Sequence, residues 1–384
     1  MQLSRRIAIV GIGETRYERA SARGLMTLLL EAAREALADA GLGARDVDGI
    51  LAPGTTYQEL HELARELGVG GQFFNAESWS GGPAVVAAPL LAALAVEAGL
   101  ATTVLCVRGI AWGSERRGNV GQFHAEMPSK ASFEIPFGWY PQVVHFAGMA
   151  RRHMELYGTT EAQLGAVAVA ARRHAALSDN ALLGAKPLAL ADYLATPYIA
   201  DPFRVHDCCL VNDGAGAFVM MSVARARDLR QPPVVVLGVG TGVSEDGEYS
   251  SLRGNYLATP AIHSAPRAFA MAGLTPADVD FVTLYDNFTS MVIQQLEDLG
   301  FCQRGEGGPF VEGGRIEVGG ELPVNPSGGQ LAQAFVLMMN NVCETVRQLR
   351  GAAGPRQIRD AEVGLVAGYS GAQHATLLLG RGVG

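Results

Sequence analysis

Two tyrosines stand at positions where a phenol could take part in proton transfer. Tyr285 follows the apolar strand pattern Phe-Val-Thr-Leu, and Tyr369 lies in a turn between the strand patterns of residues 364–367 and 375–380. Ligand sites of α/β sheets gather at the carboxyl ends of strands. Each tyrosine alone is more typical of a half-buried core phenol. Because the two lie at equivalent borders, however, we predict that they belong to a functional site, where a phenol could serve as a general acid or base.

A serine-containing turn, Asn-Ala-Glu-Ser-Trp-Ser-Gly-Gly at residues 75–82, precedes an alanine-rich apolar stretch. Neither Ser78 nor Ser80 lies in the Gly-x-Ser-x-Gly pattern of a nucleophile elbow, and no motif places a base beside them. The N–H groups at the start of a helix can still stabilise an oxyanion. We therefore predict that Ser78 belongs to an oxyanion site and is not a nucleophile.

The composition excludes several classes of function. A net charge of −8 and a pI near 5.5 leave no basic surface for nucleic acid. The apolar run at residues 83–100 contains a glutamate and two prolines, so it predicts a buried helix and no membrane span. The five cysteines lack metal-site spacing and are typical of reduced thiols in a cytoplasmic protein; we expect no metal and no bound cofactor. Gly11-Ile-Gly13 lacks the third glycine of a dinucleotide site.

The chain repeats itself. Residues 40–48 and 272–280 share Ala, Gly, Leu, Asp, Val and Asp in one register, and the apolar strands at 7–13 and 234–240 correspond as well. The Ser-Gly-Gly at 80–82 recurs at 327–329, where it is expected to open one long helix. The sequence therefore predicts two α/β halves, residues 1–228 and 229–384, with a loop or lid insertion at about 113–197 in the first half.

Several stretches resemble the thiolase superfamily, and more closely its sterol-carrier/lipid-transfer-protein branch. The resemblance covers nearly the whole chain and implies a duplicated five-layer α/β/α/β/α fold with the active site between the halves. The stretches that carry it are Arg-Arg-His-Met-Glu-Leu-Tyr-Gly at 151–158, Ile-Ala-Asp-Pro-Phe-Arg at 199–204, Asp-Cys-Cys-Leu-Val-Asn-Asp-Gly at 207–214, the long run at 285–308 and Leu-Pro-Val-Asn-Pro-Ser-Gly-Gly at 322–329.

The catalytic pattern of the family is altered in this sequence. Ser78 stands where a thiolase carries its acylated cysteine, and no histidine occurs near Phe335, where the thiolase histidine would fall. Tyr285 replaces the asparagine of the Asn-Glu-x-Phe motif, and Tyr369 replaces the second cysteine. The resemblance implies Tyr285 and Tyr369 as catalytic residues. The supporting residues that it implies at the oxyanion site or around it are Ser78, Gly371, Asp286, Asn287 and Asn325.

This exchange resembles the thiolase-like aldolases that remove side chains from steroid-type acyl-CoA thioesters. The resemblance implies retro-aldol cleavage of a β-hydroxyacyl-CoA, with CoA as part of the substrate, releasing a ketone and a short acyl-CoA such as propionyl-CoA. It also implies a separate zinc-ribbon/OB-fold partner that binds acyl-CoA, and a homodimer within an α2β2 complex. Two alternatives stay open: a degenerate acyltransferase that uses Cys106 or Cys302, and a non-catalytic acyl-CoA-binding subunit.

Overall fold

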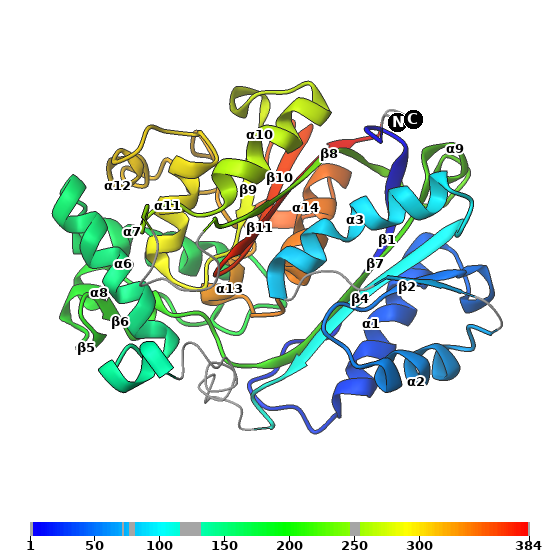
Figure 1. Ribbon diagram of the computed structural model, residues 1–384, viewed down its shortest axis with the longest axis horizontal. Helices are drawn as coiled ribbons and strands as arrows, with labels where there is room; N and C mark the ends of the chain where they lie inside the picture. The colour runs from blue at the N-terminus through cyan, green and yellow to red at the C-terminus, as the bar shows by residue number, and fades with distance from the viewer. Residues whose placement is uncertain (1–2, 71–72, 77–80, 116–131, 246–253, 383–384) are drawn as a thin grey trace.

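Nine strands form one continuous sheet in the computed structural model, which describes residues 3–70, 73–76, 81–115, 132–245 and 254–382 (Figure 1). Two further strands, β5 and β6, form a small separate sheet. The strands are β1 (Ile7–Glu14), β2 (Gly49–Leu51), β3 (Phe74–Asn75), β4 (Thr103–Ala111), β5 (Tyr198–Ala200), β6 (Phe203–Arg204), β7 (Asp213–Ser222), β8 (Val234–Val243), β9 (Phe281–Leu284), β10 (Val363–Ser370) and β11 (Gln373–Arg381).

The strand order repeats outward from the centre of the sheet. β1 and β8 pair antiparallel at the centre, through Ala8 with Val235 and Ile9 with Val234. One side then runs β1-β7-β4-β2-β3, and the other runs β8-β11-β10-β9 and ends in a parallel bridge between Val282 and Val324. Each side thus places its first strand next to its last one. The order agrees with a duplicated chain, while the boundary at residue 228 stays a prediction.

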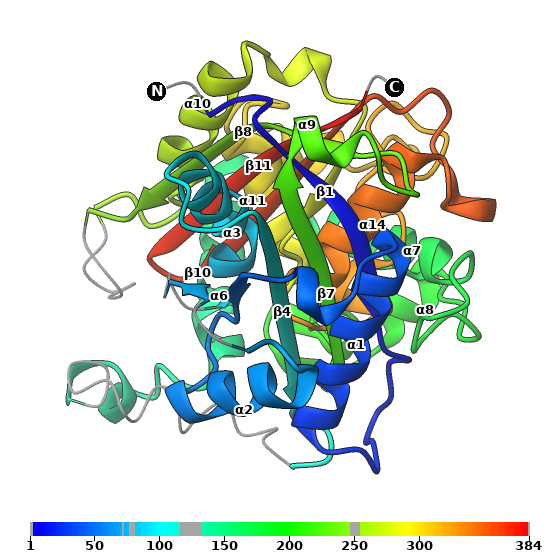
Figure 2. The ribbon, with the colours of Figure 1, turned by 90° about the vertical axis from the view of Figure 1, so that its right-hand side faces the viewer.

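Helices cover both faces of each half of the sheet. α3 and α14 pack between the two halves, where α3 contacts β10 and β11 as well as strands of its own half (Figures 1 and 2). α1 covers β1, β7 and β4, and α10 covers β8 and β11. The predicted five-layer α/β/α/β/α thiolase fold is confirmed. The helices named so far are α1 (Leu25–Ala40), α3 (Gly81–Glu97), α10 (Ala261–Ala272) and α14 (Met339–Arg350), and the others are α2 (Tyr57–Leu67), α6 (Gln142–Tyr157), α7 (Glu161–Ala175), α8 (Leu190–Ala195), α9 (Val223–Ala226), α11 (Thr289–Asp298), α12 (Gly307–Phe310) and α13 (Gly329–Ala332).

The repeated Ala-Gly-Leu…Asp-Val-Asp segment has the same structural role in both halves. Its glycines, Gly41 and Gly273, end α1 and α10 in the left-handed conformation, with φ of 73° and 69°. Its last aspartates accept hydrogen bonds from the first N–H groups of the next strand. Asp48 accepts from the N–H groups of residues 102 and 103 at 2.8 Å each, and Asp280 accepts from those of residues 362 and 363 at 2.8 Å each. The repeat therefore fixes a helix end and a strand start.

The prediction of a single long helix after Ser-Gly-Gly at 327–329 is wrong. The structure has two helices there, α13 and α14, separated by residues 333–338, and Leu337 and Met338 adopt φ of 51° and 75°. Hydrogen bonds from distant segments compete with helical ones: Asn212 Oδ1 accepts from the Phe335 N–H at 2.8 Å, and the Leu182 N–H donates to the carbonyl of Gln333 at 3.0 Å. These bonds hold Phe335 out of the helix.

The inserted segment forms its own group of helices at the left of Figure 1, with α6, α7 and α8 beside α11 and α12. Buried hydrogen bonds tie it to the core, because His153 Nε2 lies 3.1 Å from the Glu297 carboxylate and His153 Nδ1 lies 2.7 Å from Thr159. Glu297 also accepts from the Gly307 N–H at 2.9 Å. The insertion therefore packs firmly against α11, the helix that follows Tyr285.

Candidate active site

The structure brings the two predicted tyrosines together. Their ring centroids are 6.4 Å apart and the rings meet edge to face, with an interplanar angle of 68°. Tyr285 is 8% exposed and Tyr369 is 1% exposed. Tyr285 follows β9 directly, and its N–H donates to the carbonyl of Ala367 in β10 at 2.9 Å. Adjacent parallel strands thus set the spacing of the pair.

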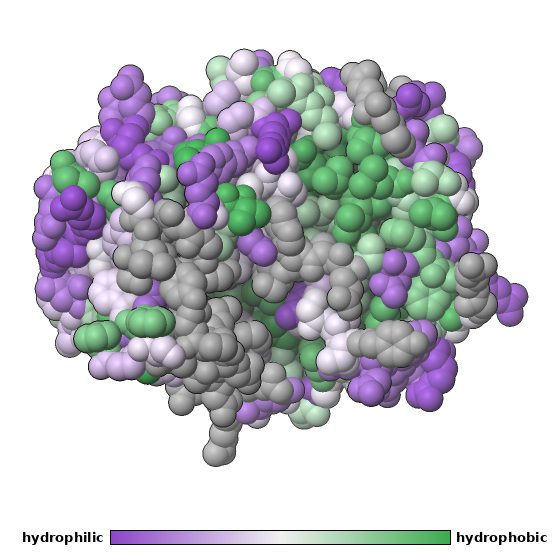
Figure 3. Space-filling view, viewed as in Figure 1, coloured by the Kyte–Doolittle hydropathy of each residue, from purple (hydrophilic) through white to green (hydrophobic). Residues whose placement is uncertain are grey.

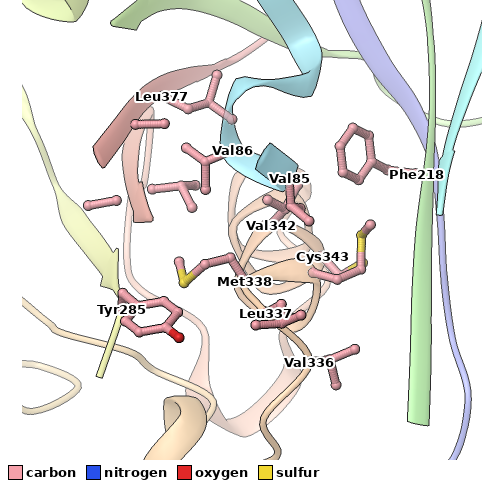
Figure 4. Packing of buried hydrophobic residues seen from close by; sticks show 14 of the residues in the cluster. Val85, Val86, Phe218, Tyr285, Val336, Leu337, Met338, Val342, Cys343 and Leu377 are labelled. Carbon is pink, nitrogen blue, oxygen red and sulfur yellow. The ribbon is translucent and has the colours of Figure 1, made fainter. Parts of the chain in front are cut away.

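The N-terminus of α3 lies against both tyrosine segments. A Cβ atom at Gly82 would come within 2.9 Å of the Tyr285 ring, and one at Gly81 within 3.4 Å of Ser370, the neighbour of Tyr369. Figure 4 shows the Tyr285 ring beside Met338, close to the start of α14. The positive end of the α3 dipole therefore lies near the pair, where it favours an anion such as a phenolate or an enolate. Ser78 itself lies outside the described residues.

Aromatic rings surround the pair. Phe146 of α6 meets Tyr369 edge to face at 6.2 Å and stacks on Phe288 at 4.7 Å, and Phe335 lies 6.2 Å from Tyr285. Phe335, the counterpart of the thiolase histidine position, therefore does contact the predicted site. Phe146 was not predicted from the sequence, in which only its place in the aromatic-rich insertion could have indicated it.

The environment of Tyr285 favours its neutral form. Burial raises the pKa of Tyr285 well above its usual value, and the nearby Cys209, Asp286 and Tyr369 raise it further. A buried neutral phenol can donate a proton but cannot act as a base.

Asp286, Asn325 and Asn287 hold the backbone around Tyr285. Asp286 accepts from the N–H of Gln330 at 2.8 Å at the start of α13. The Asn325 side chain accepts from the Leu284 N–H at 2.7 Å and donates to the Leu284 carbonyl at 3.2 Å, as a neighbouring strand would. The Asn287 carbonyl accepts from the Cys209 N–H at 2.9 Å. None of these contacts involves either phenol, so the three residues support the site through the backbone.

The structure also shows where Gly371 and Cys106 lie, and it bears on the metal and membrane predictions. Gly371 occupies the tight turn between β10 and β11, with φ of 53°. In the described part of the chain no three His, Cys, Asp or Glu side chains gather as a metal site, and no helix is long and apolar enough to cross a membrane. Cys106 is fully buried in β4, and burial raises the pKa of its thiol far above the usual value.

The stability of the protein is expected to fall as the pH rises from about 4 to about 6. Burial raises the pKa of Asp286 and of Asp298 from 3.8 to about 6. In this pH range the folded state therefore binds protons that the unfolded state has released. As the pH rises from about 4 to about 6, each carboxyl group lowers the free energy of unfolding by up to about 3 kcal/mol. Urea unfolding of the wild type and of Asp286→Asn at both pH values tests this. The variant should lose less stability than the wild type, and equal losses would contradict the assignment.

Comparisons with known proteins agree with the thiolase fold described above. A model of the thiolase C-terminal domain-like family matches residues 242–381. The chain is 40% identical to 17-hydroxy-3-oxo-4-pregnene-20-carboxyl-CoA lyase of Mycobacterium tuberculosis, covering 98% of this chain and all of the relative. It is 37% identical to a steroid side-chain-cleaving aldolase of Thermomonospora curvata, over 97% of each chain.

Solved structures show the same fold. The Ltp2-ChsH2(DUF35) aldolase superposes with a TM-score of 0.92 at 36% identity, covering 99% of both chains. Human mitochondrial 3-ketoacyl-CoA thiolase superposes with a TM-score of 0.73 at 13% identity, covering both chains fully, and supports the fold alone. The family resemblance predicted from the sequence is confirmed: this chain belongs to the thiolase superfamily, in the branch that contains the steroid side-chain-cleaving aldolases.

Proposed function

We propose that this protein cleaves a steroid-type β-hydroxyacyl-CoA by a retro-aldol reaction, releasing a ketone and a short acyl-CoA such as propionyl-CoA. The observation that carries the proposal is the pair of phenols 6.4 Å apart beside the N-terminus of α3. Two relatives at 40% and 37% identity are named as a lyase and an aldolase of this kind. Because both rings are nearly buried, a bulky thioester must displace part of what covers them.

The reaction needs one base and one acid. A base removes the proton of the β-hydroxyl group, the carbonyl forms, and the bond between the α and β carbons breaks. Its electron pair moves into the thioester as an enolate, and an acid then protonates the α carbon. We assign the acid to Tyr285, since its environment keeps the phenol neutral. By exclusion the base is Tyr369, which then has to be ionised when the substrate binds.

The enolate oxygen needs hydrogen-bond donors as the bond breaks. In the proposed reaction, backbone N–H groups near Ser78 and around Gly371 supply them, since Gly371 follows Tyr369 by two residues and the N-terminus of α3, which follows Ser78 in the sequence, adjoins Tyr285. Asp286, Asn287 and Asn325 hold the backbone around Tyr285 through their bonds to distant segments. No nucleophile and no bound cofactor takes part in this scheme.

A direct assay tests the proposal. The protein, combined with its partner, is incubated with 17-hydroxy-3-oxo-4-pregnene-20-carboxyl-CoA, the compound in the name of the mycobacterial relative. We expect a steroid ketone and propionyl-CoA in equal amounts without added CoA. Binding of the thioester without products would instead support a non-catalytic acyl-CoA-binding subunit.

Alkylation of the cysteines is expected to leave this activity largely intact. Burial raises the pKa of Cys208 and of Cys302 to about 12, so both thiols stay protonated and react slowly at neutral pH. A cysteine-dependent acyltransferase would need a thiolate in the site. Activity measured after iodoacetamide treatment tests this. Rapid inactivation that the substrate prevents would favour the acyltransferase.

We propose that a separate partner chain with a zinc-ribbon/OB-fold binds the CoA ester, since the name of the Ltp2-ChsH2(DUF35) aldolase includes a DUF35 component. This chain is expected to form a homodimer within an α2β2 complex. An apolar patch in Figure 3 lies over α3, where Leu94 is 43% exposed and Leu90 and Leu91 are partly buried. A second copy packed on this patch and on the β3 edge would cover it.

A charge in this patch is expected to disrupt the dimer. In Leu94→Glu, the proposed contact would bury an unpaired carboxylate, so the complex should dissociate to monomers at micromolar concentration. Light scattering coupled to gel filtration measures the mass. A Leu60→Ala variant, altered in the core of α2, should remain dimeric. A wild-type monomer, or an unchanged dimer in Leu94→Glu, would contradict this interface.

A further inference from the structure

Three buried side chains, one on the strand beside Tyr369 and two on the helix that follows Tyr285, carry polar atoms without a hydrogen-bond partner among the described residues. They are the Oγ of Ser290, both amide atoms of Gln294 and the Nε2 of His374. Gln294 and His374 are 0% exposed and Ser290 is 3% exposed. A buried polar atom without a partner destabilises the folded state, so a group of them in a folded protein usually binds water or a ligand.

His374 is the direct cross-strand neighbour of Tyr369. The two residues oppose each other in the β10–β11 hairpin, so their side chains leave the same face of the sheet. On that face His374 Nδ1 lies 2.7 Å from the Ser264 hydroxyl of α10, which lies 2.8 Å from the Thr376 hydroxyl. One ring nitrogen is thus anchored, and the other has no partner in the described part of the chain. Burial lowers the pKa of His374 to about 3, so its imidazole stays neutral.

Ser290 and Gln294 share a face of α11, four residues apart. Asp298, the next residue of that face, accepts from the Thr259 N–H at 2.7 Å, directly before α10. α10 also carries Ser264, the anchor of His374. The face of α11 that carries Ser290, Gln294 and Asp298 therefore turns toward α10, the helix that anchors His374. Phe146, which contacts both Tyr369 and Phe288, links the start of α11 to the same tyrosine.

The proposed reaction leaves both tyrosines in protonation states that cannot start a second turnover. After each turnover Tyr369 holds the proton of the substrate hydroxyl and Tyr285 has lost its own. With ring centroids 6.4 Å apart, the proton needs a route that resets both groups. The neutral hydrogen-bonding groups of Ser290, Gln294 and His374, called the row below, provide such a route when water binds to them.

We infer that Ser290, Gln294 and His374 form a binding site for ordered water that carries the proton away from Tyr369. In each transfer the O–H bond of the phenol breaks as a water oxygen gains that proton, and the water passes one of its own protons onward to bulk solvent. Tyr285 regains a proton from solvent in the same cycle. The three side chains act as positioning residues, since none gains or loses a proton overall. This inference rests on the proposed function for its kinetic part only.

Gln294→Met tests the water site, because methionine keeps the volume of glutamine and removes its hydrogen-bonding atoms. If water occupies the row, the melting temperature falls, kcat drops at least tenfold, KM stays within about twofold and the solvent isotope effect on kcat increases. Gln348→Met is the matched control, since Gln348 is equally buried and all its bonds run to the protein, to Glu344, Arg356 and Ile358. That variant should lose melting temperature with no change in the isotope effect.

The opposite result identifies a dry row. If Gln294→Met melts at a higher temperature than the wild type and keeps its kcat, no water is bound there and the inference is overturned. The melting comparison does not depend on any enzymatic assay. If the wild-type protein cleaves no β-hydroxyacyl-CoA, the proposed function fails, while the sign of the melting shift still decides the water site.

Discussion

Replacing Tyr369 or Tyr285 with phenylalanine is expected to lower kcat by about 10²- to 10⁴-fold, the range that general acid–base groups contribute. Phenylalanine keeps the ring and its edge-to-face packing with the other tyrosine, so the fold should stay intact. Only the hydroxyl to which we assign proton transfer is lost. Steady-state assays with the hydroxyacyl-CoA and the partner chain measure the effect, and circular dichroism checks the fold.

The control for these variants is a third buried tyrosine. Tyr193 is 0% exposed, and its hydroxyl donates to the Asp207 carboxylate at 2.8 Å. Tyr193→Phe removes a buried phenol hydroxyl away from the site, so stability should fall while kcat stays within about threefold. If Tyr285→Phe and Tyr369→Phe retained as much activity as Tyr193→Phe, the two phenols would have no catalytic role.

Gly329→Ala is expected to cost more stability than alanine at a glycine of similar positive φ that meets no neighbouring atom. Gly329 adopts φ of 58°, and a Cβ atom there would overlap the Asp286 carboxylate. Alanine at positive φ costs about 1–2 kcal/mol. Overlap with buried atoms adds about 1–3 kcal/mol and shifts Asp286, which holds the backbone beside Tyr285. We expect a loss of activity together with the loss of stability.

Gly354→Ala isolates the overlap from the backbone effect. Gly354 has nearly the same φ, 61°, and a Cβ atom there meets nothing within 4 Å. Its free energy of unfolding should therefore fall by the backbone term alone, with no loss of activity. Urea unfolding gives both values. Equal losses for the two variants would show that the contact between Gly329 and Asp286 has no energetic weight.

Much of the fold could be predicted because the two halves of the chain share a recognisable sequence motif. The repeated Asp48 and Asp280 cap the next strand in each half, so one motif specifies two equivalent helix-to-strand units. The tyrosines follow the same logic, since each lies at the end of a strand. The repeat itself and the strand that precedes each tyrosine can be recognised in a single sequence, whereas the partners of Asp48 and Asp280 lie 54 to 83 residues away.

What could not be predicted depends on contacts between distant segments. The break between α13 and α14 arises where Asn212 binds the backbone of Phe335, 123 residues away. The aromatic contacts of Phe146 and the close approach of Gly82 to Tyr285 likewise join separate elements. The pKa of Tyr285 follows from burial and from Cys209, Asp286 and Tyr369, of which only Asp286 is adjacent in sequence. Hydrophobic periodicity and secondary-structure propensity describe local sequence, so they contain no information on these contacts between distant segments.

The central claim is that an enolate forms and is protonated, with no acyl-enzyme. The measurement that tests it most directly is cleavage of 17-hydroxy-3-oxo-4-pregnene-20-carboxyl-CoA in D2O, without added CoA, followed by mass spectrometry of the products and of the protein. Because an acid delivers one solvent-derived proton to the α carbon, the account predicts propionyl-CoA that is one mass unit heavier, an equal amount of ketone and an unmodified protein. An acylated cysteine, or products that appear only when CoA is added, would contradict it.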